Sequence, residues 1–222
     1  MFLTTATMLA PNPPAPTAPD LGKVTDGKTW RVINGAVRVT EEKGKPVVHL
    51  SPTGGNQKGS NVAMALVEGL ELAEGTFEID LRGDPEGKAS FVGVAFNATE
   101  DGKTHEAVYF RPFNFKSDDP VRRAHAVQYV AWPEHTWEKL RAEKPGAYES
   151  AVAPVPDPLG WFHARIEVTA SRVNVFVDGA TRPCLSVDRL SSGKGGKAGG
   201  RVGLWVDSKE GSFADFKILR SR

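Results

Sequence analysis

The sequence predicts an all-β protein, an antiparallel β-sandwich of the jelly-roll type with one short helix in a long loop. Beyond residue 20, short runs with apolar residues at every second position alternate with glycine, proline and aspartate, and helical periodicity is almost absent. A length of 222 residues fits a single all-β domain. We therefore expect one jelly-roll domain over residues 21–222, preceded by a separate segment of residues 1–20.

The expected strands share the two-residue period of a half-buried sheet, and turn-forming residues bound each of them. In chain order they are residues 29–40, 45–51, 61–67, 75–83, 89–99, 106–115, 124–131, 161–170, 172–179, 201–208 and 212–220.

Two of these strands form the clearest hairpin. A tight turn at residues 170–172 joins them, and Val173, Val175 and Val177 then face one way. The expected helix lies within residues 135–144, where Trp137, Leu140 and Arg141 have helical spacing.

Composition limits the partners. Lys plus Arg number 28 against 27 for Asp plus Glu, a formal net charge of +1, so nothing draws the chain to nucleic acid. No apolar run reaches the roughly 18 residues of a membrane span. Residues 1–20 combine a mildly apolar start with a proline-rich linker, which we interpret as an export-signal remnant of a secreted or periplasmic protein; the alternative is an ordinary frayed N-terminus. The lone Cys184 fits a cytoplasmic location equally well, and nothing specifies an oligomeric state.

The strand at residues 75–83 carries the first catalytic candidates. Strand alternation places Glu78 and Asp80 on one face with Arg82, and Phe77 and Ile79 on the other. Two carboxylates on one face can form an acid–base pair, but the polar face of an ordinary strand has the same pattern. Polar-face residues without a catalytic part are the favoured interpretation.

The strand at residues 106–115 is the more unusual one. Alternation places Tyr109, Arg111, Phe113 and Phe115 together, so that an arginine lies among aromatic rings. Sugar rings stack their CH faces on aromatic side chains, and their hydroxyls accept hydrogen bonds from a guanidinium. We predict that Tyr109, Arg111 and Phe113 bind substrate; the alternative is an edge strand whose arginine extends to water.

The next strand, residues 124–131, offers Gln128 as a further sugar-binding residue or His125 as an acid or base. In a continuous strand these two side chains point to opposite faces, so both cannot face the sugar. A lone histidine is more often structural.

The connection from Trp132 to Gly160 is far longer than a hairpin loop. Its Trp132 and Trp137 either line a saccharide subsite or anchor the loop to the sandwich. Here and elsewhere no zinc, phosphate-loop or dinucleotide motif occurs, so we expect no cofactor. Cys184 lacks the surroundings of a nucleophile.

Taken together, the C-terminal stretches WFHARIEVTASRVNVFVDG and GRVGLWVDSKEGSFADFKIL resemble the concanavalin A-like lectin/glucanase superfamily, and residues 21–222 look most like its 3-keto-disaccharide hydrolase domains. This resemblance implies a concave sheet that holds carbohydrate. An Asn-Ser-Gly-like segment expected before the arginine strand is replaced by FVGVAFN, and the arginine follows one strand later as Arg111.

The motif E-I-D also resembles laminarinase-type glucanases, in which a further glutamate is the acid/base. That position holds Arg82 or Gly83 here, so the double displacement lacks its proton donor. Relatives in the superfamily often bind a structural calcium on the convex side, and residues 116–120 and 205–216 offer oxygen ligands, although neither matches an EF-hand loop.

Three functions remain open at this point. The first, favoured narrowly by the resemblance, is a bacterial glycoside hydrolase or lyase of the 3-keto-disaccharide hydrolase type. The second is a carbohydrate-binding module without catalysis, which the missing carboxylate pair favours. The third is a structural or interaction domain whose concave face is filled by residues 132–160.

Overall fold

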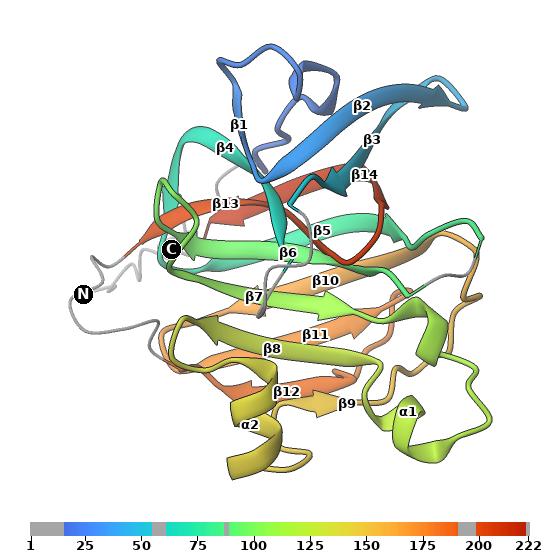
Figure 1. Cartoon of the computed structure of the whole chain (residues 1–222). Helices are drawn as coiled ribbons and strands as arrows, with labels where there is room; N and C mark the ends of the chain where they lie inside the picture. The colour runs from blue at the N-terminus through green and yellow to red at the C-terminus, as the bar shows by residue number, and fades with distance from the viewer. Residues whose placement is uncertain (1–15, 55–60, 87–88, 191–198, 221–222) are drawn as a thin grey trace, which may run out of the picture.

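Two seven-stranded antiparallel sheets pack face to face, as the sequence predicts. A computed structural model describes residues 16–54, 61–86, 89–190 and 199–220. The sheet toward the viewer in Figure 1, here called the front sheet, is ordered β1-β4-β13-β6-β7-β8-β9. Its strands are β1 (Trp30–Ile33), β4 (Ala63–Leu72), β13 (Gly200–Asp207), β6 (Phe91–Ala98), β7 (His105–Phe110), β8 (Val127–Trp132) and β9 (Glu149–Ser150).

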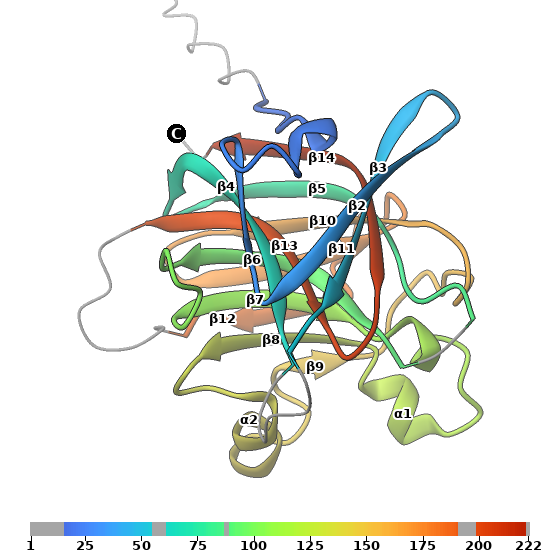
Figure 2. The ribbon, with the colours of Figure 1, turned by 45° about the horizontal axis from the view of Figure 1, so that its top comes forward.

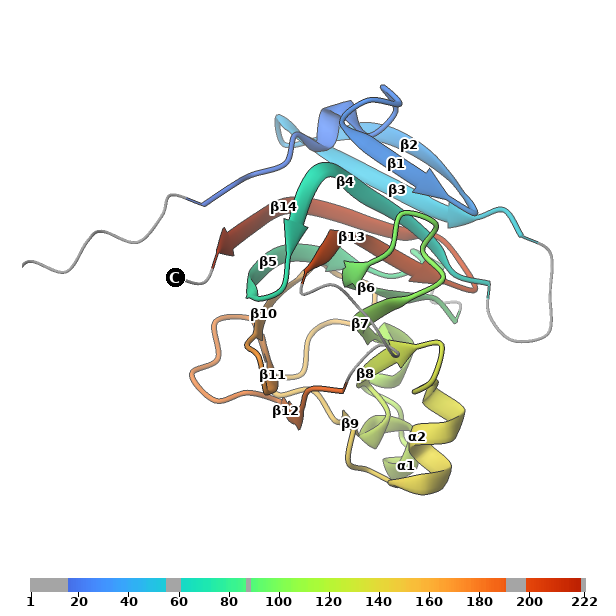
Figure 3. The ribbon, with the colours of Figure 1, turned by 90° about the vertical axis from the view of Figure 1, so that its left-hand side faces the viewer.

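The back sheet is ordered β12-β11-β10-β5-β14-β3-β2, and Figure 3 shows the two layers almost end-on. Its strands are β12 (Leu185–Asp188), β11 (Arg172–Val177), β10 (Phe162–Val168), β5 (Gly75–Arg82), β14 (Gly211–Arg220), β3 (Lys45–Pro52) and β2 (Gly35–Glu42).

The core lies between the sheets and is made by alternate residues of each strand. Phe77 of the back sheet meets Phe96 of the front sheet with ring centroids 5.7 Å apart, and Phe110 meets Phe162 at 5.1 Å. Burial of such rings is the main stabilising term in a chain without a disulfide.

The predicted hairpin is confirmed. Strands β10 and β11 pair from Ala164↔Val177 to Val168↔Val173, and the Thr169 amide donates to the Arg172 carbonyl across the turn. Val173, Val175 and Val177 are fully buried, as the alternation predicts.

One predicted strand is wrong in its extent. We expected residues 29–40 to be continuous, but Asn34 adopts a left-handed conformation with φ of 51°. This residue therefore ends β1 in the front sheet and lets β2 begin in the back sheet, a corner visible in Figure 2.

The long segment after β8 contains the predicted helix, α2 (Trp137–Glu143), whose Thr136 side chain caps the Lys139 amide. Strand β9 then pairs with β8 and becomes the last strand of the front sheet. Figure 1 shows α2 and β9 beside β8, at the edge of the sheet. Of the remaining short elements, α1 is Pro120–Ala124, η1 is Leu21–Lys23 and η2 is Pro112–Asn114.

The predicted linker of residues 1–20 lies mostly outside the described residues. Thr17 exchanges two backbone hydrogen bonds of 2.8 Å with Ile218 of β14, so the chain touches the sandwich before residue 21.

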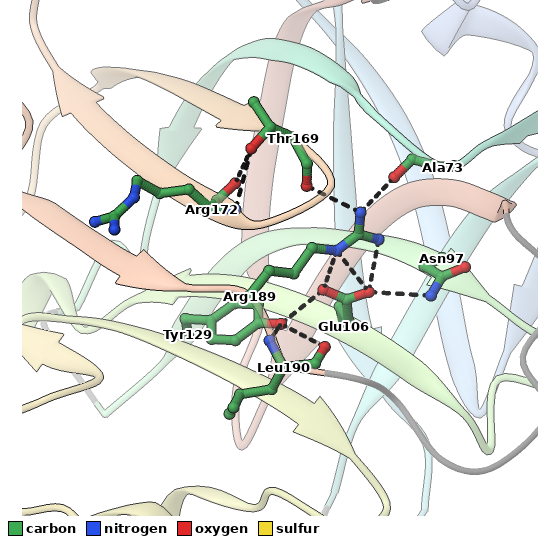
Figure 4. Close-up of polar contacts among 8 residues, drawn as sticks. All are labelled: Ala73, Asn97, Glu106, Tyr129, Thr169, Arg172, Arg189 and Leu190. Atoms are coloured by element: carbon green, nitrogen blue, oxygen red, sulfur yellow. Dashed lines mark hydrogen bonds and ion pairs between the residues drawn. The ribbon is translucent and has the colours of Figure 1, made fainter.

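A largely buried ion pair joins the two sheets near the end of β12 (Figure 4). The Arg189 guanidinium lies 2.8 Å from Glu106 of β7 and also donates to the carbonyls of Ala73 and Thr169. The Tyr129 hydroxyl donates to Glu106 at 2.6 Å and accepts from the Leu190 amide. Burial alone would lower the pKa of Arg189, but the Glu106 carboxylate raises it overall. We interpret this cluster as structural.

Candidate functional site

A row of side chains crosses the outer face of the front sheet in register. Each member pairs directly with the next across neighbouring strands, from β4 to β9, so all of them point away from the core. The row is Met64, Trp205, Gly93, Tyr109, Gln128 and Glu149.

Gly93 makes the centre of this row possible. A Cβ placed there would lie 2.1 Å from the Val108 carbonyl oxygen, so only glycine fits. With no side chain between them, the rings of Tyr109 and Trp205 stack with centroids 4.7 Å apart and an interplanar angle of 18°. The stacked pair forms a rigid floor.

Arg111 lies beside this floor and is held by three acceptors. Its Nη2 donates to Tyr109 Oη at 3.0 Å and to Gln128 Oε1 at 2.6 Å, and its Nη1 donates to the His125 carbonyl at 2.7 Å. The guanidinium also lies 5.4 Å from the Phe91 ring centroid. Arg111 is only 6% exposed, so its direction is fixed by these contacts.

The Gln128 amide has one orientation. Its Oε1 accepts from Tyr109 Oη at 3.0 Å as well as from Arg111, so a flipped amide would point its N–H groups at the N–H donor of Arg111. Its Nε2 is then a buried donor without a partner in the described structure. An unpaired buried donor costs about 1–3 kcal/mol, which a ligand oxygen would recover.

Glu149 ends the row and is already neutralised. Arg141 of α2 donates two hydrogen bonds of 2.6 and 2.9 Å to its carboxylate, and His125 Nε2 lies 3.3 Å from the same carboxylate. This hydrogen bonding raises the pKa of Arg141, whereas burial lowers the pKa of His125. Arg141 also lies over the ring of Trp137, so Trp137 belongs to the rim of this cluster.

Half-exposed aromatic rings lie on the side of Arg111 away from Glu149. Phe91 contacts Phe113 edge-on at 5.6 Å and Tyr109 at 6.0 Å. Beyond Phe91, its cross-strand partner Asp207 presents a carboxylate whose pKa burial raises. Phe91 thus lies between a cation and a carboxylate, two groups that can hydrogen-bond to the hydroxyls of a sugar stacked on its ring.

Of the predicted sugar-binding residues, Tyr109, Arg111, Phe113 and Gln128 come together, with two corrections to the strands that carry them. Strand β7 ends at Phe110 because Pro112, which lacks an N–H, begins η2. Phe115 consequently turns inward and packs on Phe162, instead of sharing a face with Arg111.

A second correction concerns His125 and Gln128. We predicted that only one of them could face a ligand, but β8 begins at Val127 and His125 ends α1. Strand alternation does not apply across that boundary. The Gln128 side chain and the His125 backbone carbonyl both accept from Arg111, and the His125 imidazole lies 3.3 Å from Glu149.

Glu78 and Asp80 lie elsewhere. They point outward from β5 in the back sheet, where Asp80 accepts from His163 Nδ1 at 2.7 Å. This hydrogen bond raises the pKa of His163. The two carboxylates form the polar face of an alternating strand, on the side of the sandwich away from Arg111.

Trp132 is placed apart from Arg111. Its ring stacks on His105, four residues before Tyr109 along β7, which corresponds to about 13 Å. Together with Met64 they line a shallow pocket of about 330 Å³. Burial lowers the pKa of His105 to about 4, and its Nε2 accepts from the Trp205 indole.

The residues missed at the sequence level are Phe91, Trp205, Asp207, Arg141 and Glu149. Trp205 and Asp207 lie some hundred residues after Tyr109, and only the strand order β13-β6-β7 brings them to it. Their alternation in residues 201–208 placed them on one face, but no local signal identified which sheet they join.

No family model matches the sequence, and no curated protein matches it either. Solved structures do share its architecture. A carbohydrate-binding module, CBM66 of Bacillus subtilis, superposes with a TM-score of 0.56 at 16% identity, covering 87% of this chain and 96% of that one.

Two further solved structures are similar. A Bacillus subtilis protein of unknown function with a galectin-like fold gives a TM-score of 0.57 at 12% identity, over 94% of this chain and 97% of that one. A putative glycosyl hydrolase of Parabacteroides distasonis gives 0.52 at 15% identity, over 90% and 93%. These likenesses confirm the jelly-roll fold.

The described part of the chain also bears on metal binding and on a membrane span. Within it, three or more His, Cys, Asp or Glu side chains nowhere gather as a metal site, and no helix there is long and apolar enough to cross a membrane. The structural calcium stays a prediction.

Proposed function

We propose that this protein binds carbohydrate on the outer face of the front sheet, around Arg111. The observation that carries the proposal is the Arg111–Gln128 pair, which offers buried donors beside the half-exposed rings of Phe91 and Phe113. A sugar ring stacked on Phe91 would place hydroxyl oxygens within reach of those donors. The fold shared with the carbohydrate-binding module supports the same use of the sandwich.

Binding without hydrolysis is the favoured form of this proposal, because Glu149 and Asp207, the described carboxylates on either side of Arg111, belong to well-separated strands. Their backbones lie on β9 and β13, four strand spacings apart, or about 19 Å. Glycosidases need two carboxyls about 5 to 9.5 Å apart. Glu149 is also held in an ion pair of 2.6 Å by Arg141.

A hydrolase or lyase of the 3-keto-disaccharide hydrolase type is the second candidate. It is favoured by the likeness to the putative glycosyl hydrolase and by the contact of His125 with Glu149. Burial lowers the pKa of His125, so a neutral imidazole would be available as a base near pH 7. A secreted or periplasmic location belongs to either candidate, and fractionation of the producing cells tests it.

The two candidates separate in one experiment. Calorimetry and product analysis with β-glucan oligosaccharides, disaccharides and 3-keto-glycosides would be run on the wild type and on Arg111→Met. The matched control is Arg165→Met, which removes an arginine from the outer face of the back sheet. Saturable binding without product, lost only in Arg111→Met, supports the binding protein. Product release lost in the same variant supports the enzyme, and absence of both contradicts the proposal.

A further inference from the structure

Arg111 is a buried cation whose contacts are all neutral. It is 6% exposed, and its three hydrogen-bond acceptors are a phenol, an amide and a backbone carbonyl. Among the described residues no carboxylate lies within ion-pair distance of it, and the segments outside that description contain neither aspartate nor glutamate. A buried charge without a counter-ion is costly, so the site has a reason to take one from solution.

The nearest carboxylates on this face are committed or too distant. Glu149 is neutralised by Arg141 through two hydrogen bonds. Asp207 lies two strands from Arg111, about 10 Å between the backbones, with Phe91 between them. Glu149 is the counter-ion of Arg141, so Arg111 has no counter-ion of its own among the described residues. Burial lowers the pKa of Arg111, the sign of a guanidinium charge that its surroundings do not compensate.

We propose that the carbohydrate bound at this face is acidic: a uronic acid unit whose carboxylate binds Arg111 and the unpaired Nε2 of Gln128. This inference rests on the proposed function and specifies its ligand. A guanidinium and an amide N–H side by side present the donors that a planar carboxylate accepts, and charge-assisted hydrogen bonds are about twice as strong as neutral ones.

The surroundings of Arg111 orient such a unit. With its carboxylate on Arg111, the ring of the sugar extends over Phe91, and hydroxyls on the far side donate to Asp207. Together, Asp207, Phe91 and Arg111 thus recognise a sugar ring that has hydroxyl donors at one end and a carboxylate at the other. A neutral sugar satisfies the first end and leaves the second without its counter-ion.

The test is a matched comparison of acidic and neutral sugars by calorimetry on the whole protein. The probes are the di- and trisaccharides of galacturonic, glucuronic and mannuronic acid, each beside its neutral counterpart, with succinate as a carboxylate that is not a sugar. We expect at least one acidic oligosaccharide to bind about tenfold or more tightly than its neutral partner. That preference should weaken as salt is raised.

The variants assign the preference to one side chain. Arg111→Met should abolish the preference for the acid, and Arg111→Lys, which keeps a charge but loses the planar fork, should retain part of it. Arg165→Met should leave it unchanged. Because the wild-type ratio needs no variant, a misfolded Arg111→Met leaves the test intact.

Each other outcome overturns the inference in a recognisable way. Neutral sugars that bind as well as or better than their acids contradict it while the proposed function stands. Succinate that binds as tightly as the uronates shows a simple anion site instead. Absence of binding to every sugar contradicts the inference and the proposed function together.

Discussion

Arg111 is a buried arginine at the front sheet and Arg189 a largely buried one after β12 of the back sheet, and they differ in their partners. Arg189 meets the Glu106 carboxylate at 2.8 Å and lies in the core-facing cluster of Figure 4. Arg111 has neutral acceptors only among the described residues and points to the outer face. Accordingly the pKa of Arg189 is raised and that of Arg111 is lowered. A buried charge that the protein neutralises holds the fold, whereas one that it leaves open indicates a ligand.

Removal of the carboxylate at the structural arginine should have the largest effect. Glu106→Gln leaves Arg189 buried without a counter-ion, and we expect the free energy of unfolding to fall by about 3–5 kcal/mol. Arg111→Met removes a buried charge that has no counter-ion, and this gain offsets the loss of its three hydrogen bonds, so the free energy of unfolding should change by less than about 1 kcal/mol. Urea unfolding of both variants measures the difference. Equal losses would contradict the distinction between the two arginines.

Loss of a tyrosine hydroxyl should likewise destabilise the fold more beside Arg189 than beside Arg111. Tyr129→Phe leaves both Glu106 and the Leu190 amide short of a partner and should cost about 1–3 kcal/mol. Tyr109→Phe removes contacts to Arg111 and Gln128, which still bond to each other, so it should cost less. Thermal unfolding compares the two, and a larger loss in Tyr109→Phe would reverse the assignment.

The aromatic rings under two arginines provide a test on binding. Phe91→Leu removes the proposed stacking surface and should weaken saccharide binding about two- to tenfold. The control is Phe176→Leu on the back sheet, where Arg165 lies 3.8 Å from the ring centroid. Calorimetry with the acidic oligosaccharides should find that control unchanged. Equal weakening in both variants would mean that Phe91 acts through the fold.

The smallest effect concerns the back sheet and depends on pH. The hydrogen bond to Asp80 raises the pKa of His163 in the folded protein. The stabilisation from this bond is therefore fully present below the unfolded pKa of histidine, about 6.5, and is lost as the pH rises through the higher pKa of the folded state. Both groups are about one-third exposed, so we expect less than about 1 kcal/mol.

Unfolding of wild type and Asp80→Asn at pH 6 and pH 9 measures this term, which should disappear in the variant. Saccharide binding should be unaffected, since Asp80 lies on the other sheet. Loss of binding in Asp80→Asn would move the site to the back sheet.

Much of the fold followed from local pattern, and the site followed only in part. The alternation in β5 correctly separated Phe77 and Ile79 from Glu78 and Asp80, because a strand with one buried face has a period of two. Tyr109, Arg111 and Gln128 were predicted together since β7 and β8 are neighbours in sequence. Pattern failed where the backbone leaves the strand, at Asn34 and at Pro112.

The remainder of the site depends on contacts between distant segments. Phe91 and Asp207 meet Arg111 through the sheet order, which no single strand encodes. Nor does the sequence distinguish Arg111 from Arg189. Their difference is whether a carboxylate lies within reach, and Glu106 is more than eighty residues from Arg189 along the chain.

Arg111, and not Arg189, should therefore meet a ligand. The most direct test is NMR detection of the arginine Nε–Hε signals while trigalacturonic, triglucuronic and trimannuronic acid are added in turn. The Arg111 signal would be assigned by its loss in Arg111→Lys, and the Arg189 signal by its loss in Arg189→Lys. We predict that one of these acids shifts the Arg111 signal progressively to saturation and leaves that of Arg189 in place. An unmoved Arg111 signal with all three acids, or equal shifts at both arginines, would contradict the assignment of the ligand to Arg111.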